Sequence, residues 1–185
     1  MKNNIFPTIF QIYRDANPKA EIGVLSEWAG IQFLVDTLST DYHAVAPDYN
    51  KFPTALCEMA EKYIKENKPS LVAICFDNPD HVGHKEGHDT PAYYSKLEEL
   101  DGYIARIVAA VKEAGMYDDT IFIITSDHGG IKKGHGGKTM AEMQTPFIIA
   151  GKNIKKAGEF QESMVQYDVA ATMAYIFGLD RKSVV

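Results

Sequence analysis

Continuous apolar runs, separated by segments with helical spacing, constrain the fold of this chain most strongly. Three such runs are "SLVAICF" at 70–76, "TIFIIT" at 120–125 and "TPFIIAG" at 145–151. Short runs rich in Val, Ile and Phe are typical of strands that are buried on both faces of a parallel sheet. We expect a further strand within "AEIGVLSEW", at 20–28.

The segments between these runs carry apolar residues at three- and four-residue intervals, which predicts helices. The helix over 90–116 has Thr90 as a cap, Pro91 just inside and Gly115 near its end, as helix-boundary preferences require. The other predicted helices cover 7–18, 30–39, 54–68 and 165–178.

Alternation of strands and helices predicts an α/β fold, with three layers and a largely parallel sheet flanked by helices. A length of 185 residues suits one domain. We therefore expect a single α/β domain over 1–185.

Composition argues against several classes of function. A net charge of −6 without a basic stripe gives no support for a nucleic-acid partner. The sequence contains no run of about 18 apolar residues, so it predicts no membrane span. The two cysteines, Cys57 and Cys75, form neither a disulfide framework nor a metal-binding spacing. Nothing in the sequence specifies the oligomeric state.

Histidines and acidic residues gather at the ends of the predicted strands. "DNPDHVGHKEGHDTP" at 77–91 follows one strand, "SDHGG" at 126–130 follows another, and "KKGHGGK" at 132–138 precedes a third. Ligands of open parallel sheets bind beyond the carboxyl ends of the strands. The three segments are therefore expected to meet at one edge of the sheet.

Imidazole and carboxylate groups in this pattern indicate a site for zinc or manganese. These loops contain no cysteine, which favours a catalytic site with an open position over a closed structural zinc site. Asp80 and His84 lie four residues apart, and Gly83 is expected to let a loop turn between them. Gly129 and Gly130 are expected to do the same beside Asp127 and His128. Each segment alone could be a solvated loop, but the three together favour a metal site.

These residues resemble the alkaline phosphatase superfamily, and within it the type I phosphodiesterase/nucleotide pyrophosphatase branch. The resemblance lies in "PDHVGHKEGHDTPAYY", "TSDHGG" and "GHGGKTMAEMQTPFIIAG", in the family's order, and extends through most of the chain. It implies hydrolysis of phosphate esters on a small phosphorylated substrate, with two divalent metal ions, usually zinc, at the carboxyl edge of the sheet.

The resemblance also implies particular ligands. Asp80, His84 and His135 match the ligands of one ion, and Asp127 and His128 match two ligands of the second. His88 has no ligand role in the family pattern and is a candidate contact for substrate or a bound anion, or a cap of the following helix. Lys138 is a second candidate for binding an anionic substrate.

The family's Ser or Thr nucleophile, and a further Asp ligand, belong to a strand end before "FPTIFQ", where only MKNNI stands here. The chain is therefore expected to be the C-terminal part of the domain, to keep one ion, and to be impaired or inactive alone. The complete protein is expected to work in the periplasm or outside the cell, although this chain itself specifies no compartment.

Other functions remain open. A sulfatase or phosphonate hydrolase, a phosphoglycerate mutase or a phosphopentomutase would share the metal scaffold, and "GHDTPAYY" favours the phosphodiesterases among them. A non-catalytic metal- or anion-binding module is a further alternative. The simplest alternative is a flavodoxin-like module whose histidines have no common function.

Overall fold

The computed structural model describes residues 7–160 and 162–179 of the chain. Residues 1–6, next to the expected position of the family's nucleophile strand, residue 161 and the C-terminal "DRKSVV" lie outside these residues. The chain divides into two compact units: the first holds residues up to 59, 67–75 and from 160 onward, and the second holds 60–66 and 76–159.

The first unit contains a parallel sheet. Its strands are β1 (Ile22–Ser26), β2 (Tyr42–Val45) and β3 (Leu71–Cys75), in the order β2-β1-β3. Ile22 pairs with Leu71 and Gly23 with Tyr42, both in parallel register. Every residue of β1 is buried, as expected for the central strand of a covered parallel sheet.

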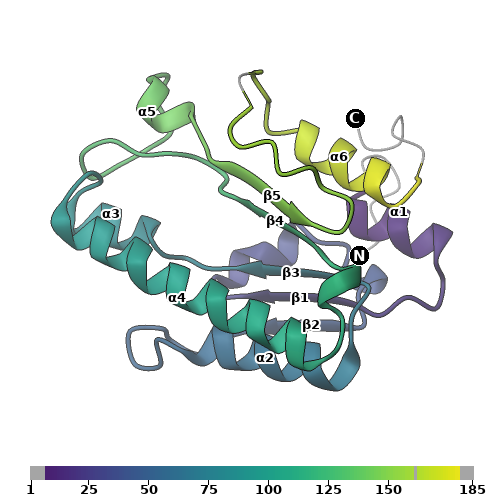
Figure 1. The fold of residues 1–185 in the computed structure, drawn as a ribbon. Helices are drawn as coiled ribbons and strands as arrows, with labels where there is room; N and C mark the ends of the chain where they lie inside the picture. The colour runs from purple at the N-terminus through teal and green to yellow at the C-terminus, as the bar shows by residue number, and fades with distance from the viewer. Residues whose placement is uncertain (1–6, 161, 180–185) are drawn as a thin grey trace. The chain divides into compact units, whose positions relative to one another are not determined.

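Helices of the same unit pack at one end of this sheet. In Figure 1, α1 (Ile9–Ala16) and α6 (Asp168–Ile176) lie side by side. The rings of Tyr13 and Phe177 are 4.2 Å apart between centroids, and Tyr13 forms a core cluster with Ile22 and Leu71. This apolar cluster joins the N- and C-terminal helices to the sheet.

The second unit contains five of the six histidines: His81, His84, His88, His128 and His135. It includes α3 (Asp80–Glu86), α4 (Pro91–Glu113), β4 (Ile121–Thr125), α5 (Met140–Met143) and β5 (Phe147–Gly151). The predicted cap of α4 is confirmed, since the Thr90 side chain accepts a hydrogen bond from the Tyr93 N–H. Residues 60–66 of α2 (Ala55–Asn67) also belong to this unit.

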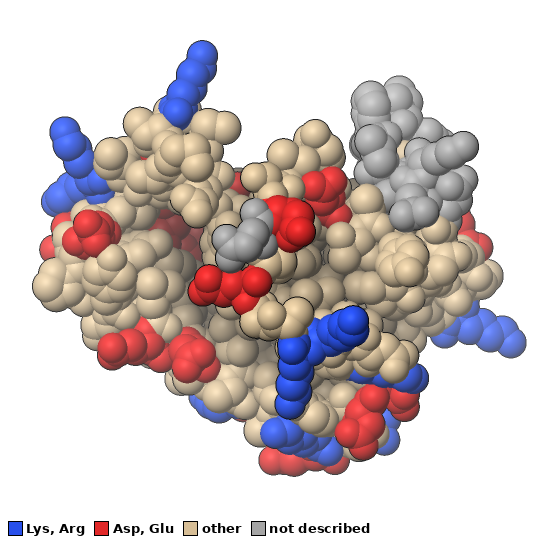
Figure 2. Space-filling view, turned by 45° about the horizontal axis from the view of Figure 1, so that its top comes forward, with Lys and Arg blue, Asp and Glu red and all other residues tan. Residues whose placement is uncertain are grey.

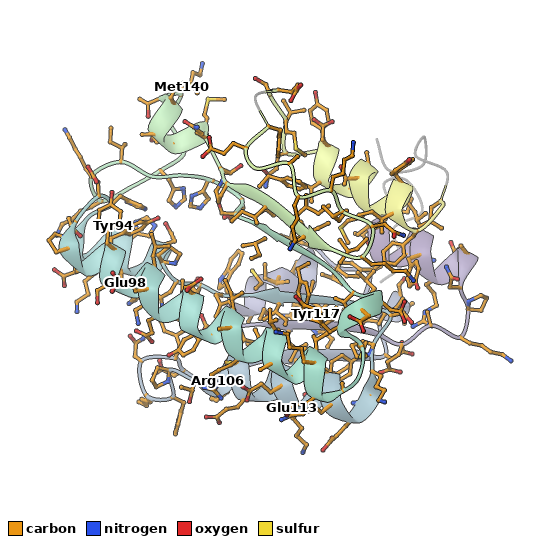
Figure 3. All side chains as sticks on the ribbon, in the orientation of Figure 1. Tyr94, Glu98, Arg106, Glu113, Tyr117 and Met140 are labelled. Carbon is orange, nitrogen blue, oxygen red and sulfur yellow. The ribbon has the colours of Figure 1, made fainter. Side chains whose placement is uncertain are left out.

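Charged side chains join α4 to this part of α2. The guanidinium of Arg106 donates through Nε and Nη2 to the two carboxylate oxygens of Glu61, at 2.8 and 2.9 Å. Lys65 Nζ lies 3.2 Å from Glu113 Oε2, and Figure 3 shows Arg106 and Glu113 on the α4 ribbon. The two-pronged Arg106–Glu61 pair is the geometry in which such contacts are strongest.

The predicted α/β class, with a parallel sheet flanked by helices, is confirmed. One strand direction differs from the expectation: β4 and β5 pair with each other in antiparallel register, Ile121 opposite Gly151. A parallel neighbour requires a crossover, usually a full helix. The connection over 126–146 contains only the four-residue α5, so β5 returns alongside β4 in the opposite direction.

The predicted helix over 30–39 is wrong. The segment forms two short 3₁₀ turns, Ala29–Phe33 and Thr37–Ser39. Phe33, Leu34 and Leu38 are 83%, 67% and 75% exposed, so no apolar face is packed to sustain a helix. Asp36 is buried instead, and its carboxylate accepts hydrogen bonds from the backbone and hydroxyl of Thr8. Strand β2, which was not predicted, follows this segment.

Two surface properties bear on partners. Within the described residues, no helix is both long enough and apolar enough to cross a membrane. On the face drawn in Figure 2, the described Lys and Arg side chains lie among Asp and Glu side chains rather than in one continuous basic area. The absence of a nucleic-acid partner stays a prediction.

Candidate metal centre

Asp80 and His84 are brought together by a helix. Asp80 stands in the first turn of α3, and His84 lies one turn later on the same face. The distance from His84 Nε2 to Asp80 Oδ2 is 3.2 Å. The convergence therefore comes from i,i+4 helical spacing, and not from a loop turning at Gly83 as the sequence had suggested.

His135 joins them from a tight turn of the segment between β4 and β5. Ile131 and Gly134 form an isolated antiparallel bridge, and Lys132 between them has a φ of 52°. His135 Nε2 lies 3.2 Å from His84 Nε2 and 3.8 Å from Asp80 Oδ1. One ligand atom from each of the three residues lies within 4.8 Å of the other two.

A backbone carbonyl orients the imidazole of His84. Its Nδ1 lies 3.0 Å from the carbonyl oxygen of Lys133. A carbonyl can only accept, so Nδ1 carries the proton that it donates, and the neutral ring presents the lone pair of Nε2. Ligating histidines of metal sites are typically held in this way by a hydrogen bond at the other ring nitrogen.

One oxygen of Asp80 indicates that the cluster fits an ion. Asp80 Oδ1 is buried and has no hydrogen-bond partner among the described residues. A buried carboxylate oxygen without a partner costs free energy, and a divalent cation bound by the three side chains would remove that cost. One carboxylate and two imidazoles are a typical ligand set for zinc with a position left for water or substrate.

Asp127 and His128 follow β4 after one residue, Ser126, and His128 lies beside this group. The ring of His128 stacks on that of His135, with centroids 3.7 Å apart and an interplanar angle of 17°. His128 Nδ1 donates to the Gly129 carbonyl at 2.8 Å, which leaves its Nε2 lone pair available. The Asp127 side chain is 87% exposed, with Oδ2 3.6 Å from His128 Nε2. Their role as ligands of a second ion stays a prediction.

The two glycines after His128 are required for close packing. A Cβ on Gly129 would lie 2.2 Å from the Ala141 carbonyl oxygen, and one on Gly130 would lie 2.2 Å from His88 Nε2. Neither adopts a positive φ. The expectation that they supply an unusual turn is thus replaced by a spatial reason: other groups occupy the position of a side chain.

The two predicted substrate contacts lie in different environments. His88 is 9% exposed, and its Nε2 lies 3.5 Å from Asp80 Oδ1. Lys138 is exposed, three residues after His135. Tyr93 packs beside the His88 ring, with centroids 5.3 Å apart. Burial, and secondly the Asp80 carboxylate, raise the pKa of the Tyr93 hydroxyl above its usual value, so Tyr93 is no phenolate nucleophile at neutral pH.

The Glu142 carboxylate, which was not among the predicted site residues, holds the segment after His135. Glu142 accepts hydrogen bonds from the Gly137 N–H at 2.9 Å and the Thr139 hydroxyl at 2.6 Å. The Thr139 hydroxyl, and then the Gly137 N–H, lower the pKa of Glu142. The spacing of Thr139 and Glu142 is that of a capping box and was readable from the sequence. The backbone carbonyls of Lys132 and Lys133, which contact His88 and His84, could not be recognised in the sequence, because every residue has a backbone carbonyl.

A family model for type I phosphodiesterase / nucleotide pyrophosphatase matches residues 15–163. The chain belongs to this family. Its membership of the alkaline phosphatase superfamily, indicated by the motifs around Asp80, Asp127 and His135, is thereby confirmed.

Two kinds of enzyme are among the curated relatives. The human GPI ethanolamine phosphate transferase 2 catalytic subunit is 28% identical over 138 residues, which cover 71% of this chain and 14% of that protein. The 2,3-bisphosphoglycerate-independent phosphoglycerate mutase of Vibrio vulnificus is 30% identical over 165 residues, covering 85% of this chain and 30% of that protein. This family member thus spans well under half the length of either relative.

Solved structures support the fold. The crystal structure of Ps i-CgsB matches with a TM-score of 0.68 at 16% identity, covering 93% of this chain and 53% of that one. A candidate sulfatase, yidJ of Bacteroides fragilis, matches with a TM-score of 0.55 at 19% identity, covering 77% of this chain and 38% of that one. At these identities the likeness concerns the fold alone.

Proposed function

We propose that this chain supplies a divalent-metal site for the cleavage or transfer of phosphate esters, with zinc as the preferred ion and manganese as the alternative. Asp80, His84 and His135 hold one ion. The observation that carries the proposal is the buried, unpartnered Asp80 Oδ1, within 3.8 Å of the imidazole nitrogen of His135, in a member of a phosphodiesterase family.

When bound, a pair of divalent ions polarises the phosphoryl oxygens and lowers the pKa of a bound water to about 7. Backbone carbonyls of this chain hold the imidazole groups in place: the Lys133 carbonyl contacts Nδ1 of His84, and the Gly129 carbonyl contacts Nδ1 of His128. Asp127 and His128 are the proposed ligands of the second ion, beside the first because His128 stacks on His135. Exposed Lys138 attracts the anionic substrate from the neighbouring loop.

The five proposed ligands include no Ser or Thr, the residue types that the family resemblance implies for the nucleophile. We therefore propose that the chain alone turns over phosphate esters slowly or not at all. Removing a nucleophile typically costs several orders of magnitude in rate. The substrate of the complete protein is a small phosphorylated compound.

A second reaction deserves a parallel assay, because one relative at 30% identity is a phosphoglycerate mutase. Phosphomutation and phosphoester hydrolysis share the requirement for metal ligands, and they differ in the acceptor of the phosphoryl group. Sulfate ester cleavage is a further alternative within the superfamily.

The first test measures zinc binding by titration calorimetry to the wild-type chain and to Asp80→Asn. We expect Asp80→Asn to lower the affinity more than about 100-fold, because it removes a charged ligand. Asp101→Asn is the matched control, since Asp101 is an exposed residue of α4, and it should bind zinc like the wild type. Equal affinity in all three proteins would overturn the proposed site.

The second test concerns phosphoryl chemistry. Inorganic phosphate should bind the zinc-loaded chain and should not bind Asp80→Asn. Zinc binding without any phosphate binding would instead support a metal-binding module. Hydrolysis of p-nitrophenyl phosphoesters by the chain alone, at the rate of an ordinary enzyme, would contradict the proposed weak or absent turnover. Cleavage of p-nitrophenyl sulfate in preference to the phosphates would favour the sulfatases.

A further inference from the structure

His88 is a buried histidine directly behind the proposed ligands. It follows α3, and its side chain is 6% exposed. Its backbone N–H donates to the Lys132 carbonyl at 2.6 Å, and its ring Nδ1 lies 3.0 Å from the same oxygen. Since the carbonyl only accepts, Nδ1 carries a proton and donates it there. One carbonyl of the Ile131–Gly134 turn thus holds both the backbone and the ring of His88.

Two glycines make room for this ring. A Cβ built on Gly83 would lie 2.4 Å from His88 Nε2, and one built on Gly130 would lie 2.2 Å from the same atom. Real Cβ atoms do not approach other atoms this closely, and neither glycine has a positive φ. The ring therefore fills the space between α3 and the segment that follows β4.

The ring touches every segment that supplies a proposed ligand. Gly83 belongs to α3, which carries Asp80 and His84. Gly130 follows His128, and the turn containing Lys132 leads to His135. The separation between Asp80 and His135 therefore depends on the volume of the His88 ring and on its bond to Lys132.

We propose that His88 is a positioning residue that sets the distance between α3 and the His135 turn, and so prepares the Asp80–His84–His135 site for its ion. The inference depends on the proposed metal site. It replaces the substrate contact expected from the sequence, because a side chain that is 6% exposed presents little surface to a substrate. Nor is His88 one of the three grouped ligands.

The experiment compares zinc affinity and folding in His88→Ala. We expect a loss of about 10- to 100-fold in affinity, the usual effect of removing a group that orients metal ligands, with circular dichroism close to that of the wild type. The visible spectrum of the cobalt(II)-loaded protein should change in band position and intensity, because that spectrum reports ligand geometry. Wild-type affinity and spectrum in a folded His88→Ala would overturn the inference.

A pair of glycine variants decides the matter should His88→Ala fail to fold. Gly130→Ala keeps the histidine at position 88, but the added methyl group displaces its ring, so the affinity for zinc should fall. Gly134→Ala lies on the same turn, where a Cβ would meet nothing within 4 Å, and affinity should stay unchanged. Equal affinities of Gly130→Ala, Gly134→Ala and the wild type would overturn the role of His88. Failure of the wild type itself to bind zinc would instead overturn the proposed function.

Discussion

At the scale of single residues, the unusual feature is a buried carboxylate oxygen for which the described residues supply no hydrogen-bond donor. Asp80 Oδ1 is buried without a hydrogen bond, although three imidazole rings lie near it. The rings of His84 and His128 are each fixed through Nδ1 by a backbone carbonyl. Such hydrogen bonds select the tautomer that a metal ion requires before any ion arrives.

The ionisation of Tyr93 provides a test at this scale. Burial raises its pKa and the nearby Asp80 carboxylate raises it further. A raised pKa means that the folded state holds the phenol proton more tightly than the unfolded state does. The contribution of this proton to the free energy of unfolding is therefore fully present below about pH 10, and it is lost as the pH rises through the folded-state pKa. In an alkaline absorbance titration, Tyr93→Phe should remove a phenol that titrates above its usual range. Loss of a phenol that titrates at or below pH 10 would contradict the assignment.

At the scale of helices and strands, local sequence explains some elements and packing explains others. Helix α4 has its predicted cap at Thr90 and a proline in its first turn, and it forms where expected. Helix α3 was not predicted, because its seven residues include a glycine and two histidines and too few apolar residues to reveal a helical period. Its backbone nevertheless makes i,i+4 helical hydrogen bonds: the Gly83 N–H donates to the Pro79 carbonyl and the Gly87 N–H to the Gly83 carbonyl.

Gly151 at the end of β5 provides a prediction about an element. Its φ is 127°, and a Cβ there would lie 2.2 Å from the carbonyl oxygen of Thr120, the residue just before the paired strand β4. Gly151→Ala should therefore lower the free energy of unfolding by about 1–3 kcal/mol, measured by urea denaturation. Gly102→Ala is the control within α4, where a Cβ meets nothing within 4 Å. It should raise stability by about 0.5–1 kcal/mol. Destabilisation by both variants to the same extent would contradict this account.

At the scale of the whole molecule, the proposed ligands all come from the second compact unit, between residues 76 and 159. They are far apart in the sequence: His84 and His135 are 51 residues apart, yet their Nε2 atoms lie 3.2 Å from each other. An ion that binds them ties α3 to the connection between β4 and β5. Metal binding should therefore stabilise the fold of this unit.

Linkage makes this expectation quantitative. An ion at 100 times its dissociation constant adds about 2.7 kcal/mol to the free energy of unfolding, which for a chain of this size raises Tm by about 5–10 °C. Differential scanning calorimetry with zinc, and then with excess chelator, should show this rise and its reversal. Asp80→Asn should show neither. A Tm that is unchanged by zinc at saturating concentration would count against the site.

The amino-acid sequence by itself determined the α/β class, most helix and strand positions and the family, because apolar periodicity and short motifs are local properties. It also indicated Asp80, His84 and His135 as one ligand group. Only the tertiary structure decided that α3 is a helix, that β5 runs antiparallel to β4, and that His88 is buried beside the proposed ligands. These features depend on which backbone carbonyls and glycines meet in space, such as Lys132 with His88, and contacts over 44 residues leave no periodic trace in a sequence.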